Sequence, residues 1–95
     1  MKVTAANIAT LPGGDLIERG LDDLQNGRES PEALLVSIGG PRLRRLGLPV
    51  TTALSSPEHR LYALLAEGKG DGAHSAYNAL IRRLVSFERA AECVS

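Results

Sequence analysis

The feature that most constrains this fold is the C-terminal stretch from Ala73 to Val94, which contains neither glycine nor proline. It is the longest uninterrupted periodic segment of the chain. At about 1.5 Å of rise per residue, a helix over this stretch would be roughly 33 Å long, enough to cross a small domain. We therefore predict a long C-terminal helix onto which the other elements pack.

Spacing the residues of this helix 100° apart gathers its apolar side chains into one continuous arc. The arc contains Ala76, Tyr77, Leu80, Ile81, Leu84, Phe87 and Ala91. The opposite side contains Ser75, Arg82, Arg83, Ser86 and Arg89. With Val85 included, the arc covers nearly half of the circumference, whereas a helix buried on one side needs a stripe of only ~100°. This width predicts contact with two neighbouring helices, or with one neighbour and a second subunit.

Two polar residues interrupt the apolar arc. Glu88 lies among its apolar members, and His74 lies at its edge. A carboxylate brought toward a core requires a cation or several hydrogen-bond donors, because an unpaired buried charge is costly. We interpret Glu88 as reaching the rim of the core and pairing with an arginine. The alternative is that Glu88 faces a pocket or an interface.

Composition favours an all-α domain. The 95 residues suffice for one domain, and leucine and alanine outnumber the β-branched and aromatic residues. Aromatic side chains are limited to Tyr62, Tyr77 and Phe87. The core is therefore small, and chains of this size often gain stability by oligomerising.

Turn and cap signals divide the rest of the chain into three further helices and one short helical turn. We expect helices over residues 15–26, 31–38 and 57–67, with the short turn over residues 41–46. Ser-Pro-Glu opens both the second helix, where Ser30 is the N-cap, and the fourth helix, at Ser56. The helix over residues 31–38 is apolar nearly all round, so it should be the most buried element.

Glycine marks several boundaries and one predicted close contact. Gly20 lies inside the first helix, where it costs about 1 kcal/mol relative to alanine, and close approach of a neighbouring helix would compensate. The Gly68–Gly72 stretch is expected to be a flexible loop, with Asp71 capping the last helix. The predicted architecture is a compact bundle of four main helices plus one short helical turn, organised around the C-terminal helix. Residues 1–14 form a flexible arm and turn, and residues 15–95 a single helical domain.

The arginines are the strongest functional signal. The short turn carries Arg42, Arg44 and Arg45, and the polar side of the last helix carries Arg82, Arg83 and Arg89. If the two groups converge, they form a basic patch for phosphate or for an acidic surface. Yet the formal net charge is zero, with acidic residues in excess before residue 40 and basic residues in excess after it. That asymmetry fits internal pairing or self-association better than general nucleic-acid binding.

Metal, catalytic and membrane signals are weak. The histidines His59 and His74 match no metal-ligand spacing, and the single cysteine, Cys93, forms no internal disulfide. No apolar run approaches the length of a membrane span, and no secretory segment is recognisable, so we expect a cytoplasmic, soluble protein of bacterial type. We expect no catalytic residue, cofactor or metal, although a small enzyme or metal site around His59, His74 and Glu88 remains an alternative.

The leading functional hypothesis is a non-enzymatic protein–protein interaction module that forms a homodimer or engages another protein. A nucleic-acid-binding regulator using the arginine patch is the second hypothesis. The candidate interaction residues are Arg42, Arg44, Arg45, His74, Tyr77, Arg82, Arg83, Glu88 and Arg89.

Overall fold

The computed structural model describes residues 8–50 and 53–94, and within these ranges the regular structure is helical. In chain order the elements are α2 (Gly14–Gln25), α3 (Pro31–Ile38), α4 (Gly40–Arg45), α5 (Pro57–Lys69), the 3₁₀ turn η1 (Gly70–Gly72) and α6 (Ala73–Val94). The prediction of an all-α fold with four main helices, one short helix and a long C-terminal helix is confirmed. The helix over Ala73–Val94 has the predicted bounds.

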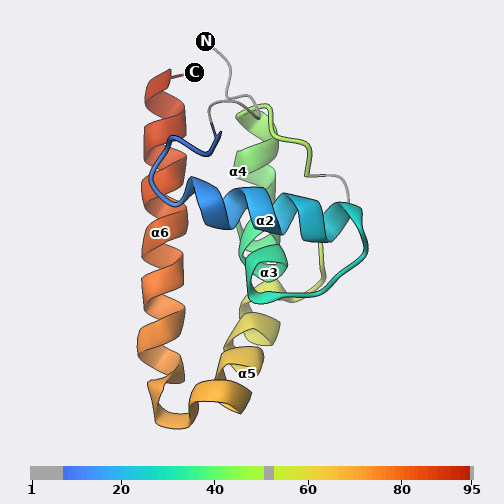
Figure 1. Cartoon of the computed structure of the whole chain (residues 1–95), viewed down its shortest axis with the longest axis vertical. Helices are drawn as coiled ribbons and strands as arrows, with labels where there is room; N and C mark the ends of the chain where they lie inside the picture. The colour runs from blue at the N-terminus through green and yellow to red at the C-terminus, as the bar shows by residue number, and fades with distance from the viewer. Residues whose placement is uncertain (1–7, 51–52, 95) are drawn as a thin grey trace.

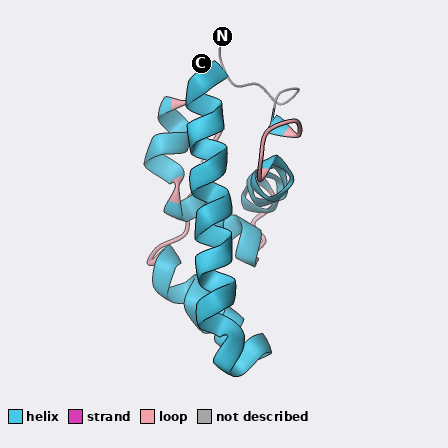
Figure 2. Cartoon of the chain, turned by 90° about the vertical axis from the view of Figure 1, so that its left-hand side faces the viewer, coloured by secondary structure: helices cyan, strands magenta, loops and turns pink. Residues whose placement is uncertain are grey.

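Most of the helices run along the long axis of the molecule: α3 continued by α4, then α5, and α6. Helix α2 crosses them. Figure 1 shows α3 and α4 following one another upward, α5 descending below them, and α6 rising beside them to the C-terminal end. In the view turned by 90°, α2 is seen nearly end-on at one side of α6 (Figure 2). The molecule measures 41 × 25 × 18 Å, so its thinnest dimension is about two helix diameters of ~10 Å.

Helix α2 packs closely on α3 through Gly20. A Cβ atom added to Gly20 would collide with the carbonyl oxygen of Glu32 and with a methyl group of Val36. The predicted close approach is confirmed, because only a hydrogen at this position lets the two helices come together. The helix begins after Gly13, whose φ of 73° is in the left-handed region that favours glycine.

Helix α3 is the most buried element, as predicted. The side chain of Ser30 accepts a hydrogen bond from the Ala33 amide at 3.0 Å, which confirms Ser30 as the N-cap. Residues Ala33 to Val36 have no exposed surface. This short helix contacts α2, α4, α5 and α6, and it is therefore the hub of the core.

The linker between α4 and α5 is held to the core by polar contacts. The Leu48 amide donates to the Leu43 carbonyl at 3.0 Å, and the Leu54 amide donates to the Ser37 hydroxyl at 2.9 Å. Ser37 is buried and in turn donates to the Ala33 carbonyl. The first bond ties the start of the linker to α4, and the second ties its end to α3 before α5 begins.

Around α5, the predicted start at Pro57 is confirmed, and the predicted loop after this helix is wrong. Helix α5 does begin at Pro57, but Ser56 has a φ of 46° and its side chain makes no cap bond, so the second Ser-Pro-Glu start differs from the first. The Gly68–Gly72 stretch is not a flexible loop: α5 continues to Lys69 and Gly70–Gly72 form η1. Asp71 lies within this turn rather than directly before α6. Tight 3₁₀ hydrogen bonding thus connects the antiparallel α5–α6 hairpin.

The predicted N-terminal arm is partly within the described residues. Residues 1–7 lie outside them, so the flexibility expected there is untested. Ile8 is buried and Leu11 packs against the core, while Gly14 already belongs to α2. Across the described ranges, the helices lack the combination of length and apolarity that a membrane span requires.

Candidate interaction surface

The apolar face of α6 is covered over only part of its length. In the C-terminal half, Leu84, Phe87 and Ala91 are buried. In the N-terminal half, Ala76, Tyr77, Leu80 and Ile81 are packed against the core but remain partly exposed. Around the helix, Leu80 lies between Phe87 and Ala91, so it faces the core direction. We attribute its exposure to the small number of neighbours there, because α5 is the long helix that lies beside this half of α6 among the described elements.

A pair of tyrosines, one exposed and one half-buried, marks the uncovered region. The ring centroids of Tyr62 on α5 and Tyr77 on α6 are 5.8 Å apart with an interplanar angle of 59°. Tyr62 is 42% exposed and is the one large hydrophobic residue that is exposed among the described residues. Ile81 and Val85, which follow Tyr77 at four-residue intervals on α6, are half-buried. We call Tyr62, Tyr77, Ile81 and Val85 the tyrosine surface.

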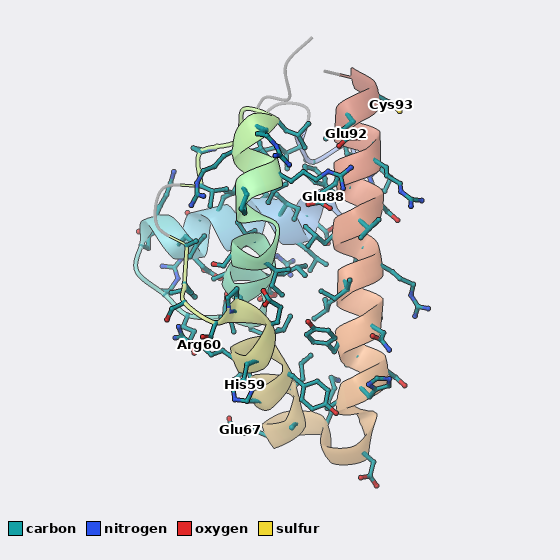
Figure 3. All side chains as sticks on the ribbon, turned by 180° about the vertical axis from the view of Figure 1, so that it is seen from behind. His59, Arg60, Glu67, Glu88, Glu92 and Cys93 are labelled. Carbon is teal, nitrogen blue, oxygen red and sulfur yellow. The ribbon has the colours of Figure 1, made fainter. Side chains whose placement is uncertain are left out.

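A charged cluster adjoins the tyrosine surface near the C-terminal end of α6. Figure 3 shows Glu88 and Glu92 between α6 and the helix that carries Arg42, and both carboxylates approach its guanidinium. Arg42 Nε donates to Glu92 Oε1 at 2.8 Å, and Arg42 Nη1 lies 3.5 Å from Glu88 Oε1. One guanidinium thus serves two carboxylates, which leaves the Arg42–Glu88–Glu92 cluster with one surplus negative charge when both are ionised.

Glu88 is the buried member of this cluster. It is 5% exposed, and a Cβ atom added to Gly39 would lie 3.1 Å from its Oε2 atom. Burial raises the pKa of Glu88, the nearby Arg42 opposes that change, and Glu92 adds to it. The prediction that Glu88 pairs with an arginine is confirmed, but Glu88 lies inside the α4–α6 contact rather than at the rim.

The remaining arginines of the short turn do not face α6 in the same way. Arg44 Nε donates to the Val50 carbonyl at 2.8 Å, which fixes the linker after α4. Arg45 is exposed and makes no ion pair with any residue in the described ranges. Of the three, Arg42 alone therefore joins α4 to α6.

The arginines of α6 are also divided. Arg83 pairs with Asp15 of α2 at 3.1 Å, an intramolecular pair with the acidic first helix. Arg82 and Arg89 are exposed and form no ion pair with the described residues. Arg42, Arg44 and Arg83, half of the predicted basic set, are thus engaged within the chain.

The histidines are not brought together with Glu88. His74 lies at the start of α6, and its Nε2 atom is 3.2 Å from Asn78 Nδ2. Fourteen helical residues separate His74 from Glu88, a distance of about 21 Å along the axis. Figure 3 shows His59 on α5, on the side away from α6. Within the described residues, no group of three histidine, cysteine or acidic side chains is arranged to hold a metal ion.

Four residues of the tyrosine surface and the charged cluster were missing from the sequence-based candidates: Tyr62, Ile81, Val85 and Glu92. Glu92 shares the face of Glu88 at a four-residue interval, so periodicity alone was enough to include it. Tyr62 could not be included in the same way, because nothing local indicates that its ring meets Tyr77. No family model, curated protein or solved structure matches the chain.

Proposed function

We propose that this chain is a non-enzymatic protein–protein interaction module that associates with a second copy of itself through the tyrosine surface. The observation that carries the proposal is the exposed Tyr62 of α5, which packs against the half-buried Tyr77 on the uncovered half of α6. Tyrosine is enriched among residues that dominate binding energy, because its ring buries much apolar area while its hydroxyl tolerates water.

The shape of the molecule supports the same proposal. The thinnest extent is 18 Å, and the α5–α6 hairpin continues beyond the part of α6 that α2 and α4 cover. A two-helix layer buries only one side of each helix, so a further helix or helix pair is needed to cover the other apolar side chains. A stable interface buries about 800 Å² on each partner. We expect a contact of that size to extend along much of α6.

Light scattering coupled to gel filtration tests the proposal. The full chain is expected to elute as a dimer at high micromolar concentration. Ile81→Asp and Tyr62→Glu each place a charge in the tyrosine surface, so both variants are expected to shift the equilibrium to the monomer. Because Tyr62 is substantially exposed in the single chain, its replacement should not unfold the helices, and the helical circular dichroism should stay unchanged.

Ser86→Asp is the matched control, because Ser86 is exposed on α6 away from the tyrosine surface. This variant adds the same charge to the same helix and is expected to remain dimeric. A full-length chain that stays monomeric throughout the concentration range would overturn the proposal. So would a dimer that neither Tyr62→Glu nor Ile81→Asp weakens.

The two alternatives receive less support from the geometry. Nucleic-acid binding would use the predicted basic set, but half of these arginines already bind groups within the chain. The exposed Arg82 and Arg89 both lie on α6. A site combining His74 with Glu88 would have to bridge about 21 Å along α6. The tyrosine surface needs no such rearrangement.

A further inference from the structure

The edge of α6 that carries part of the tyrosine surface has a pattern of its own. One stripe along this edge contains residues at alternating intervals of four and three, namely His74, Asn78, Ile81, Val85, Glu88 and Glu92. This is the spacing of the residues that face a partner in a two-helix coiled coil. Its centre is apolar, its N-terminal end carries the imidazole and amide, and its C-terminal end carries the two carboxylates.

The stripe is complementary to its own inverted copy. Turning the helix end for end about position 83 exchanges His74 with Glu92, Asn78 with Glu88, and Ile81 with Val85. Each exchange brings a nitrogen-bearing group opposite a carboxylate, or one aliphatic side chain opposite another. A parallel pairing would instead place Glu88 and Glu92 against their own counterparts, and like charges in contact are unfavourable.

We infer that the second copy docks antiparallel along this edge of α6, with the two-fold axis between Ile81 and Val85 and the exposed His74 of each copy against the Arg42–Glu88–Glu92 cluster of the other. This inference rests on the proposed self-association and specifies its geometry. His74, Asn78 and Glu92 are exposed, and Ile81 and Val85 are half-buried. Glu88 is buried beside Arg42, so the other five stripe residues are the ones that a second copy can reach.

The charges of the Arg42–Glu88–Glu92 cluster suit a histidine from the second copy. Two carboxylates share the single guanidinium of Arg42, and the Glu92 side chain is 50% exposed. A histidine from the second copy supplies a hydrogen-bond donor, or a positive charge when protonated, to that exposed carboxylate. Asn78 follows one turn later and directs its amide toward the same cluster, where Glu88 remains held by its own Arg42.

The geometry also contains one unfavourable contact, which makes it easier to test. In the antiparallel arrangement, Arg82 flanks the stripe close to the two-fold axis and faces its own counterpart. Arg82 is exposed and has no acidic partner among the described residues. Arg89 flanks the stripe on the same side but lies opposite Ser75 of the other copy.

Disulfide trapping decides the orientation. All variants carry Cys93→Ser, which removes the exposed native thiol. One variant adds His74→Cys and another adds Glu92→Cys; both are oxidised mildly, alone and as an equimolar mixture. The mixture is expected to form a cross-linked dimer. Each variant alone is not, because its two cysteines would lie about 27 Å apart across the axis.

Glu92→Cys also removes the ion pair with Arg42, which could itself change the dimer. A second pair of cysteines leaves that ion pair in place. Ile81→Cys and Val85→Cys are expected to cross-link with each other when mixed. Ser86→Cys, on the outer side of α6, is the control and should cross-link with none of them. A further readout is Arg82→Gln, which should tighten the dimer roughly two- to fivefold by removing the like-charge contact. Arg89→Gln should not tighten it.

The outcomes separate the orientation from the proposed function. If light scattering shows a dimer but His74→Cys cross-links with itself, or neither mixed pair cross-links, the antiparallel inference is overturned and self-association stands. If light scattering shows only a monomer, both are overturned. The inference is supported if the cysteine variants cross-link in the mixtures and His74→Cys and Glu92→Cys do not cross-link by themselves. Tighter association of Arg82→Gln supports it as well.

Discussion

Arg42 on α4 and Glu88 on α6 are 46 positions apart in the chain, and their Nη1 and Oε1 atoms lie 3.5 Å apart. The same guanidinium makes a shorter bond to Glu92, at 2.8 Å. The better-paired carboxylate is thus the exposed one, and the buried carboxylate of Glu88 receives the longer contact. Burial consequently outweighs the attraction of Arg42, and the pKa of Glu88 is raised.

This relationship predicts a pH dependence of stability. Because the pKa of Glu88 is higher in the folded chain than its ordinary value of 4.5, the folded state binds this proton more tightly than the unfolded state. The free energy of unfolding should therefore fall as pH rises from about 4.5 through the raised pKa. In Glu88→Gln this decline should disappear. Urea unfolding followed by circular dichroism across that range measures it.

Glu92→Gln serves as the control for the Glu88 prediction, because Glu92 is exposed and its substitution makes the same change of a carboxylate to an amide beside Arg42. The decline in stability should persist in this variant. A Glu88→Gln protein whose stability still falls with pH as in the unsubstituted chain would assign the titration to another group.

A second prediction compares two glycines within helices. Gly20→Ala should destabilise the protein by about 1–3 kcal/mol, because the added methyl group collides with the Glu32 carbonyl and Val36. Gly68→Ala meets no atom within 4 Å and should stabilise it by about 0.5–1 kcal/mol through helix propensity. Chemical denaturation of the two variants gives both values. Equal effects at the two positions would show that the α2–α3 contact is looser than described.

A third prediction concerns the hydroxyl that ties the linker to α3. Ser37→Ala removes the acceptor of the Leu54 amide and should cost about 1–3 kcal/mol of unfolding free energy. Faster hydrogen exchange at Leu54 should accompany the loss. Ser86→Ala, at an exposed position on α6, should change stability by no more than about 0.5 kcal/mol. Unchanged exchange at Leu54 would mean that this hydrogen bond does not hold the linker.

A fourth prediction concerns the acidic end of α2. The hydrogen bond from Ser30, followed by that from Arg28, lowers the pKa of Asp23 below its ordinary value of 3.8. The folded state therefore releases this proton more readily, and the resulting stabilisation is present above 3.8 and lost as pH falls through the lowered pKa. Asp23→Asn should remove that acid-side dependence. An NMR titration of the Asp23 carboxyl carbon checks the direction directly, and a normal or raised pKa would contradict it.

Local signals were sufficient to predict the helices. The bounds of α6 follow from an uninterrupted apolar period, and the start of α3 follows from Ser30 and Pro31. Gly20 indicated a close helix contact without identifying its partner. Such predictions succeed because periodicity, N-caps and missing side chains act over a few residues. The Gly68–Gly72 region was mispredicted because glycine permits both a loop and a tight 3₁₀ turn.

The candidate surface required both kinds of information. By itself, the sequence determined that α6 has an apolar face too wide for one neighbour and that Glu88 lies within it. Only the tertiary structure decided that Leu84 and Phe87 are covered while the region around Tyr77 is not. It also decided that, within the described ranges, Arg42 is the arginine that meets Glu88 and Glu92. These outcomes depend on which distant helices lie alongside α6, and a helical period fixes the direction of a side chain but not the neighbour it meets.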